Sequence, residues 1–172
     1  MVVMRRIVLF GMPGSGKSTQ GQKLAAYLGY PWISTGEILR SSKEKWVQEK
    51  LKTAELFDDT VIFQLLKNAI NGKNNVILDG FPRNRAQTEM AVNDLGVKEV
   101  IELVVPEEKV YARLSERGRE QDNISVAKER IEDYKRMRRE VEEAFFHHGI
   151  EIKRIDGDGT IDEVFERVKE AL

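Results

Sequence analysis

The chain has no cysteine among its 172 residues. Disulfide bonds, thiolate zinc sites and a cysteine nucleophile are therefore excluded. No apolar run approaches the roughly 20 residues that a membrane-spanning helix needs. The formal net charge is only −1, from 28 basic and 29 acidic side chains, and this balance gives no reason to expect a nucleic acid or a membrane surface as a partner. We expect a cytoplasmic globular protein that acts as a monomer.

Hydrophobic residues make up 41% and charged residues 33% of the chain, a composition typical of a globular domain with a sizeable core. Short apolar runs alternate with stretches of helical periodicity. This alternation predicts a single α/β domain over residues 1–172, with a five-stranded parallel sheet flanked by helices. The expected strands are 6–10, 32–33, 76–79, 100–105 and 151–155. The expected helices are 17–28, 36–53, 85–95, one from Asp58-Asp59 to Gly72, one starting at Pro106, a long one reaching Phe145, and 160–172.

The stretch from Gly11 to Ser18, GMPGSGKS, has the spacing of a phosphate-binding loop and lies between an expected strand and an expected helix. Glycines allow the backbone to turn its N–H groups toward phosphate oxygens, and the following helix adds the positive end of its dipole. Lys17 would contact the β- and γ-phosphates of ATP. A glycine-rich turn without a ligand is the alternative, but the flanks favour a three-layer P-loop NTPase fold. The residues expected at ATP here are Gly11, Pro13, Gly14, Ser15, Gly16, Lys17, Ser18 and Thr19.

Two oxygen-bearing side chains are the candidate ligands of Mg²⁺. The Ser18 hydroxyl follows the loop lysine, and Asp79 ends the expected strand 76–79. In phosphate-loop proteins a carboxylate at such a position holds the metal directly or through a bound water. The alternative is that Asp79 only caps the turn before Gly80.

Four blocks of this chain resemble the adenylate kinase family of nucleoside monophosphate kinases. They are residues 11–20, residues 33–40, residues 79–83 with Gln87, and residues 113–122 with Arg130. They occur in the family's order, and the resemblance covers essentially the whole chain.

This resemblance implies phosphoryl transfer from MgATP to AMP, giving two ADP. Arg40 and Arg83 would bind the α-phosphate of AMP, while Thr35 and Gln87 would hydrogen-bond its base. Kinases of uridylate and cytidylate typically have Ala and Asn at those last two positions, so both residues favour AMP. The residues expected at AMP are Thr35, Gly36, Arg40, Gly80, Arg83, Gln87, Arg119 and Arg130.

The same resemblance assigns arginines to the donor and to the transferring group. Arg113 would stack on the adenine of ATP, which a planar guanidinium can do, and Arg117 would contact the ATP phosphates. Taken alone, an arginine is more often a solvated surface residue, so these assignments depend on the surrounding motifs. The expected catalytic residues are Lys17, Arg83, Arg117, Arg119 and Arg130.

Two segments depart from the family pattern. The expected acceptor-binding segment, residues 34–63, and the expected lid, residues 117–123, are both shorter than in typical members, and the lid has no cysteine for zinc. The shortened acceptor segment keeps UMP, CMP or another small acceptor open as an alternative. A P-loop ATPase or a nucleotide switch acting through a partner is the rival from another class.

Because lid closure normally expels water from the reacting phosphates, we predict measurable ATP hydrolysis without an acceptor. The measurement compares the rate of phosphate release with the rate of transfer. A hydrolysis rate below about one per cent of transfer would show that the short lid excludes water well.

Overall fold

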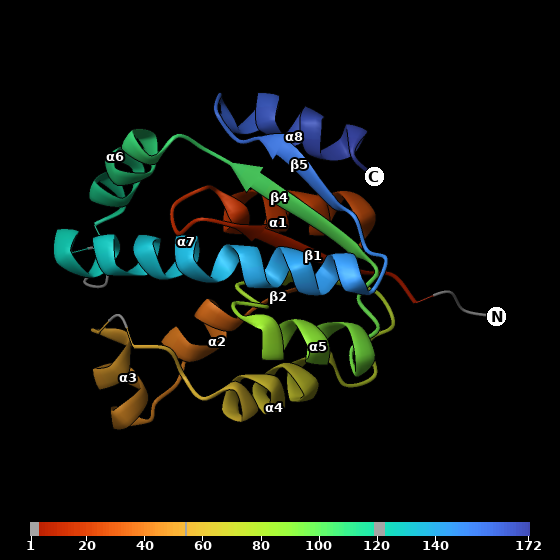
Figure 1. Ribbon diagram of the computed structural model, residues 1–172, viewed down its shortest axis with the longest axis horizontal. Coiled ribbons are helices and arrows are strands. Elements are labelled where there is room, and N and C mark those ends of the chain that lie inside the picture. The colour runs from red at the N-terminus through yellow and green to blue at the C-terminus, as the bar shows by residue number, and fades with distance from the viewer. Residues whose placement is uncertain (1–3, 54, 119–122) are drawn as a thin grey trace.

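The computed structural model describes residues 4–53, 55–118 and 123–172. Over this part of the chain, five parallel strands form one sheet in the order β2-β3-β1-β4-β5 (Figure 1). The predicted five-stranded parallel α/β sheet is therefore confirmed. The strands are β1 (Arg6–Gly11), β2 (Trp32–Ser34), β3 (Val76–Asp79), β4 (Glu99–Val104) and β5 (Ile152–Asp156).

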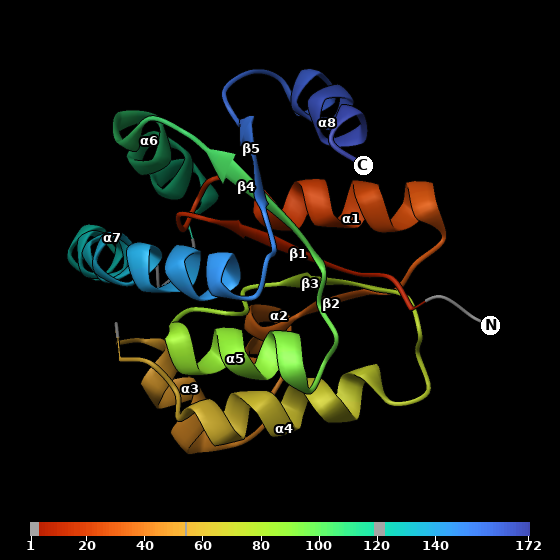
Figure 2. The ribbon, with the colours of Figure 1, turned by 45° about the vertical axis from the view of Figure 1, so that its right-hand side comes forward.

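Helices cover both faces of the sheet. Figure 2 shows α1 and α8 on one side of the sheet and α4, α5 and α7 on the other. None of the helices found in the described residues is long and apolar enough to cross a membrane. The helices are α1 (Lys17–Leu28), α2 (Thr35–Arg40), α3 (Lys45–Leu51), α4 (Asp59–Ile70), α5 (Arg85–Asn93), α6 (Glu107–Arg117), α7 (Ile124–His147) and α8 (Ile161–Glu170).

The central strand explains why the apolar runs are unbroken. Along β1, Ile7 and Leu9 pack into the core beneath α1 and α8, while Val8 and Phe10 pack into the core of the opposite face. Successive side chains of a strand point to opposite faces, so a strand covered on both sides must be apolar throughout.

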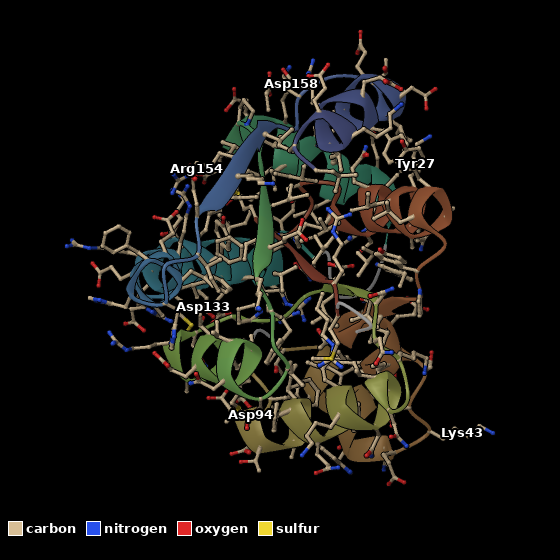
Figure 3. The ribbon with its side chains drawn as sticks, turned by 90° about the vertical axis from the view of Figure 1, so that its right-hand side faces the viewer. Tyr27, Lys43, Asp94, Asp133, Arg154 and Asp158 are labelled. Carbon is tan, nitrogen blue, oxygen red and sulfur yellow. The ribbon has the colours of Figure 1, made fainter. Side chains whose placement is uncertain are left out.

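Charged side chains such as Lys43 and Asp94 project from the surface (Figure 3).

One expected helix is divided in two. The predicted continuous helix over 36–53 is wrong, because α2 ends at Arg40 and α3 begins only at Lys45. The Gln48 side-chain amide closes the break by donating to the Ser42 carbonyl at 2.6 Å and to the Arg40 carbonyl at 3.3 Å. A side chain thus satisfies carbonyl groups that the end of α2 leaves free.

The other boundaries differ from the predictions by a few residues, as helix and strand ends usually do. Pro106, for example, is the N-cap of α6 and not its first helical residue. The predicted start of the last helix is confirmed, since Thr160 and Glu163 form a reciprocal capping box.

Gly21 allows α1 to pack closely on the sheet. A Cβ at this position would lie 2.8 Å from Trp32 Nε1 and 3.1 Å from Leu9 Cδ1. Replacing a helical glycine by alanine normally stabilises a helix by about 1 kcal/mol. Here we predict the opposite sign, a loss of roughly 1–3 kcal/mol for Gly21→Ala, because the methyl group would overpack the core.

Denaturant unfolding measures this effect. The control is Gln22→Ala at the adjacent exposed position, which should change the free energy of unfolding by no more than about 0.5 kcal/mol. A Gly21→Ala variant as stable as the unaltered protein would contradict the close packing.

Candidate functional site

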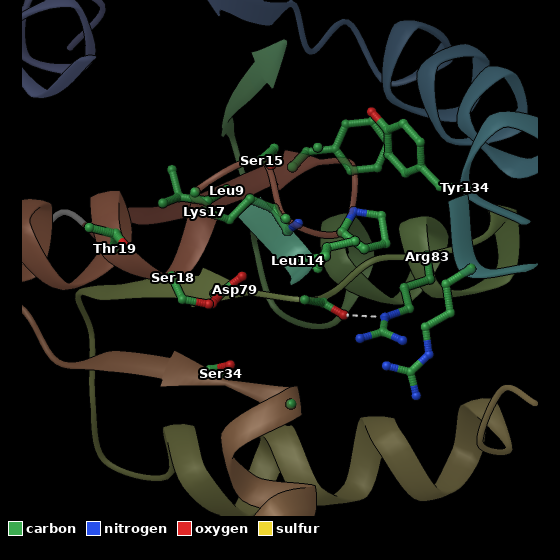
Figure 4. Close-up of a pocket in the computed structure, with 18 of the residues that line it drawn as sticks. Leu9, Ser15, Lys17, Ser18, Thr19, Ser34, Asp79, Arg83, Leu114 and Tyr134 are labelled. Atoms are coloured by element: carbon green, nitrogen blue, oxygen red, sulfur yellow. Dashed lines mark hydrogen bonds between the residues drawn. The ribbon is translucent and has the colours of Figure 1, made fainter. Parts of the chain in front are cut away.

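A cavity of about 730 Å³ opens beyond the carboxyl ends of the strands (Figure 4). Its wall includes the loop 11–18, the end of β3, and residues of α2, α6 and α7. Ligands of open parallel sheets bind at this edge, and the volume suits a small molecule.

The phosphate loop passes through a narrow space between β4 and α6. A Cβ on Gly11 would lie 2.7 Å from the Leu103 carbonyl oxygen, and one on Gly14 would lie 2.9 Å from Leu114 Cγ. Both glycines have positive φ, 142° and 81°, which other residues rarely adopt. The glycine spacing read from the sequence thus has a steric cause as well as a conformational one.

Lys17, the first residue of α1, reaches back over this loop. Its Nζ donates a hydrogen bond to the Met12 carbonyl at 2.7 Å. Burial lowers the pKa of Lys17, Asp79 opposes this shift and the guanidinium groups of Arg83 and Arg117 add to it, with a net pKa of about 8. The ammonium group is thus already desolvated at a position where a bound phosphate would stabilise its positive charge.

Ser18 and Asp79, the two candidate ligands of Mg²⁺, lie together. The Ser18 hydroxyl donates to Asp79 Oδ2 at 2.6 Å, and Asp79 is only 2% exposed (Figure 4). A hydroxyl and a carboxylate are hard oxygen donors of the kind that Mg²⁺ prefers. Within the described residues there is no cluster of three or more His, Cys, Asp or Glu side chains that could hold a metal.

Two arginines line the opposite part of the cavity. Arg40 of α2 forms an ion pair with Glu37 at 2.8 Å. Arg83 donates through Nε to the Gly80 carbonyl at 2.9 Å. Burial lowers the pKa of Arg83, but its normal value is so high that the guanidinium remains charged.

The two residues expected at the acceptor base are buried and are not part of the cavity wall. Thr35 donates to the Gly80 carbonyl at 3.0 Å. The Gln87 amide accepts from the Arg83 backbone N–H at 2.8 Å and donates to Asp59 Oδ1 at 2.7 Å. The carbonyl oxygen of this amide can accept one more hydrogen bond, and its NH₂ group can donate one more. In this structure the two side chains support the Gly80–Arg83 turn, and their contact with a base stays a prediction.

The remaining described arginines of the predicted site extend to the cavity from α6 and α7. Arg113 donates to the carbonyl of Gly157 at 3.1 Å and, at 3.4 Å, to that of Ser15. Arg117 is the last residue of α6 and lines the cavity. Arg130 donates to the carbonyls of Leu51 and Thr53, both at 3.1 Å, at the end of α3. Arg119 and most of the predicted lid, residues 119–122, lie outside the described residues.

Sequence reasoning missed two parts of the cavity wall. Gly157, Gly159 and Ile161 form the side next to Arg113. The glycines at 157 and 159, directly after the last strand, were an available signal, because ligands bind where parallel strands end. Tyr134 and Arg138 of α7 also line the cavity, but in the sequence they read as ordinary positions of a long helix.

Fold and cavity together define a phosphate-loop protein that can hold nucleotide phosphates between the loop lysine and the arginines. Comparison with known proteins narrows this class. The family model described as "Adenylate kinase" matches residues 9–150. The adenylate kinase of Mycobacterium sp. (strain MCS) is 38% identical over 181 positions, which cover 97% of this chain and 98% of the relative. The adenylate kinase of Thermus thermophilus is 33% identical over 100% of this chain and 99% of its own.

The chain therefore belongs to the adenylate kinase family. The resemblance read from the four sequence blocks, the P-loop fold and the nucleoside monophosphate kinase class are confirmed. The Thermus alignment has 187 positions against the 172 residues of this chain, so about 15 positions of that relative have no residue here. This chain is thus shorter than that relative.

The pKa of Lys17 predicts how nucleotide affinity depends on pH. Because Lys17 is protonated below about pH 8 and neutral above it, ATP affinity should fall by up to about tenfold per pH unit above that value. In Lys17→Arg the cation keeps its proton, so affinity should be nearly flat between pH 8 and 9.5. Titration calorimetry measures both. Equal slopes in the two proteins would assign the pH dependence to another group.

Proposed function

We propose that this chain transfers the γ-phosphoryl group of MgATP to AMP, giving two ADP. One observation carries the proposal: the phosphate loop with Lys17 and the turn with Arg83 face the same cavity from opposite sides. Membership of the adenylate kinase family supports the same reaction. A donor and an acceptor held in one cavity can react in line.

The donor occupies the loop side in this proposal. Loop N–H groups and the start of α1 bind the phosphates, and Lys17 follows the transferring group. Arg113, held against the Gly157 carbonyl, stacks on the adenine, while Arg117 contacts the phosphates. The proposed donor residues are Gly11, Pro13, Gly14, Ser15, Gly16, Lys17, Ser18, Thr19, Arg113 and Arg117.

The acceptor occupies the side of α2 and the Gly80–Arg83 turn. Arg40 and Arg83 bind the AMP phosphate as planar forks, and Thr35 and Gln87 recognise the base. Gly36 and Gly80 allow close approach of the backbone, and Arg119 and Arg130 complete the clamp. No general base is needed, because the attacking atom is already an anionic phosphate oxygen.

Magnesium fits the oxygen pair of Ser18 and Asp79. The Ser18 hydroxyl would ligate it directly, and Asp79 would hold it directly or through a water. Once bound, the ion neutralises charge on the β- and γ-phosphates. The protein's part is to position these two oxygens and Lys17. We further propose that the enzyme is a cytoplasmic monomer whose acceptor-binding segment is residues 34–63 and whose lid is residues 117–123.

An acceptor panel tests the reaction. ATP is offered with AMP, dAMP, UMP, CMP or GMP, and ADP formation is followed. We expect AMP to be the preferred acceptor. Preferred transfer to UMP or CMP would show that AMP is not the acceptor. ATP hydrolysis with transfer to none of the nucleotides would refute the kinase assignment in favour of an ATPase or a nucleotide switch.

Side-chain replacement tests the roles. Lys17→Met and Arg130→Ala should each lower kcat by about a hundredfold or more, since each removes a charge that stabilises the transferring group. The matched control is Lys23→Met, also on α1, whose ammonium pairs with Asp162 on the surface and should not affect kcat. Unchanged kcat in either of the first two variants would remove that residue from the proposed machinery.

A further inference from the structure

Glu102 is a buried carboxylate for which the proposed reaction has no use. It lies within β4 and its side chain is only 2% exposed. Three side chains surround it with hydrogen bonds: Tyr134 Oη at 2.7 Å, Arg138 through Nε at 2.7 Å and a second nitrogen at 3.0 Å, and Arg154 Nε at 3.0 Å. Burial raises the pKa of Glu102, but the hydrogen bonds from Arg138 and Tyr134 together with the charges of Arg138 and Arg154 lower it overall. The carboxylate is therefore ionised and held from several directions.

Two of these partners lie on α7, close to the cavity. Tyr134 follows Arg130 by one helical turn, so the two side chains share a face of α7, and both line the cavity. The Tyr134 ring also packs on Phe10, with ring centroids 5.3 Å apart. Phe10 immediately precedes Gly11, so Tyr134 links α7 to the strand that leads into the phosphate loop (Figure 4).

Other contacts of α7 include partly exposed ion pairs, of Lys135 with Glu107 and of Glu142 with Arg154, and apolar packing. Ile131, Val141 and Phe145 are fully buried in the core. Such packing is non-directional, whereas hydrogen bonds to a fixed carboxylate depend steeply on distance and angle. The Glu102 contacts are made at a buried carboxylate and therefore help to define the rotation and the axial position of α7, with the Tyr134 contact one turn from Arg130.

Arg130 is sensitive to that position because it extends away from α7. Its guanidinium reaches the carbonyls of Leu51 and Thr53 on the acceptor side, both at 3.1 Å. A small slide or rotation of α7 would move this group relative to both nucleotides. Misplacement of a reacting or charge-stabilising group by about 1 Å can lower a rate by a hundredfold.

We propose that Glu102 and Tyr134 are positioning residues, which fix α7 so that Arg130 is aligned on the transferring phosphoryl group. The inference rests on the role proposed above for Arg130. Neither Glu102 nor Tyr134 needs to touch a nucleotide in this arrangement.

The test is a double-mutant cycle in kcat between Tyr134→Phe and Arg130→Ala. Tyr134→Phe keeps the ring on Phe10 and removes only the hydroxyl. We expect it to lower kcat by about tenfold, with KM for ATP and AMP within about twofold, because alignment matters chiefly in the transition state. In the Arg130→Ala background the same change should lower kcat by less than about twofold. The shift in unfolding midpoint caused by Tyr134→Phe should be the same in both backgrounds.

A control at the same carboxylate separates alignment from general stability. Arg154→Gln removes a 3.0 Å hydrogen bond to Glu102 from the β5 side, and it also removes a contact to Glu142 far from Arg130 on α7. It should lower the unfolding midpoint while kcat stays within about twofold.

Three results would overturn the inference: unchanged kcat in Tyr134→Phe, an equal loss in Arg154→Gln, or a tenfold loss that persists without Arg130. A different result, unchanged kcat in Arg130→Ala alone, would instead refute the role that the proposed function gives to Arg130.

Discussion

The structure of the site depends on the close fit of the phosphate loop between β4 and α6. Gly11 lies against the Leu103 carbonyl and Gly14 against the Leu114 side chain, at distances that exclude a Cβ atom. This fit turns the loop backbone toward the cavity, and it also brings the start of α1, with Lys17 and Ser18, to the same point. Because Leu114 packs on the loop, α6 carries Arg113 and Arg117 to its edge. On the donor side of the site, the loop, the start of α1 and the end of α6 are thus positioned together by the same packing contacts.

Around this unit, the arginines are oriented by two kinds of partner. Arg83 and Arg113 donate hydrogen bonds to backbone carbonyls, of Gly80 and Gly157 respectively. A carbonyl orients a guanidinium without neutralising it, so the charge remains available to phosphate oxygens. Arg138 and Arg154, in contrast, pair with the Glu102 carboxylate. Their charges are compensated within the protein, which suits a structural role around Glu102 and not the binding of an anion.

The sheet, the phosphate loop and the pairing of Ser18 with Asp79 could be predicted from sequence, because each has a local pattern. Apolar runs report strands, glycine spacing reports the loop, and a carboxylate at a strand end indicates the candidate metal position. The division between α2 and α3 could not be predicted, because it depends on the Gln48 amide reaching back to carbonyl groups. Similarly, nothing local to Gln87 indicates that Asp59 holds its amide. Contacts between residues distant in sequence leave no periodicity to read.

Glu102 shows the same limit most clearly, since in the sequence it is one acidic residue within an apolar strand. Its environment also argues for the purpose of the network. Burying a carboxylate between two arginines seldom stabilises a protein more than apolar packing of the same volume, because desolvation offsets the attraction. What such a network supplies, and apolar packing does not, is a definite geometry, since a displaced α7 would leave buried charges unpaired. The positions where this geometry has most effect are those nearest the cavity, Tyr134 and Arg138. Because these positions lie next to the cavity, a role in aligning the reacting groups explains the buried carboxylate better than a contribution to stability does.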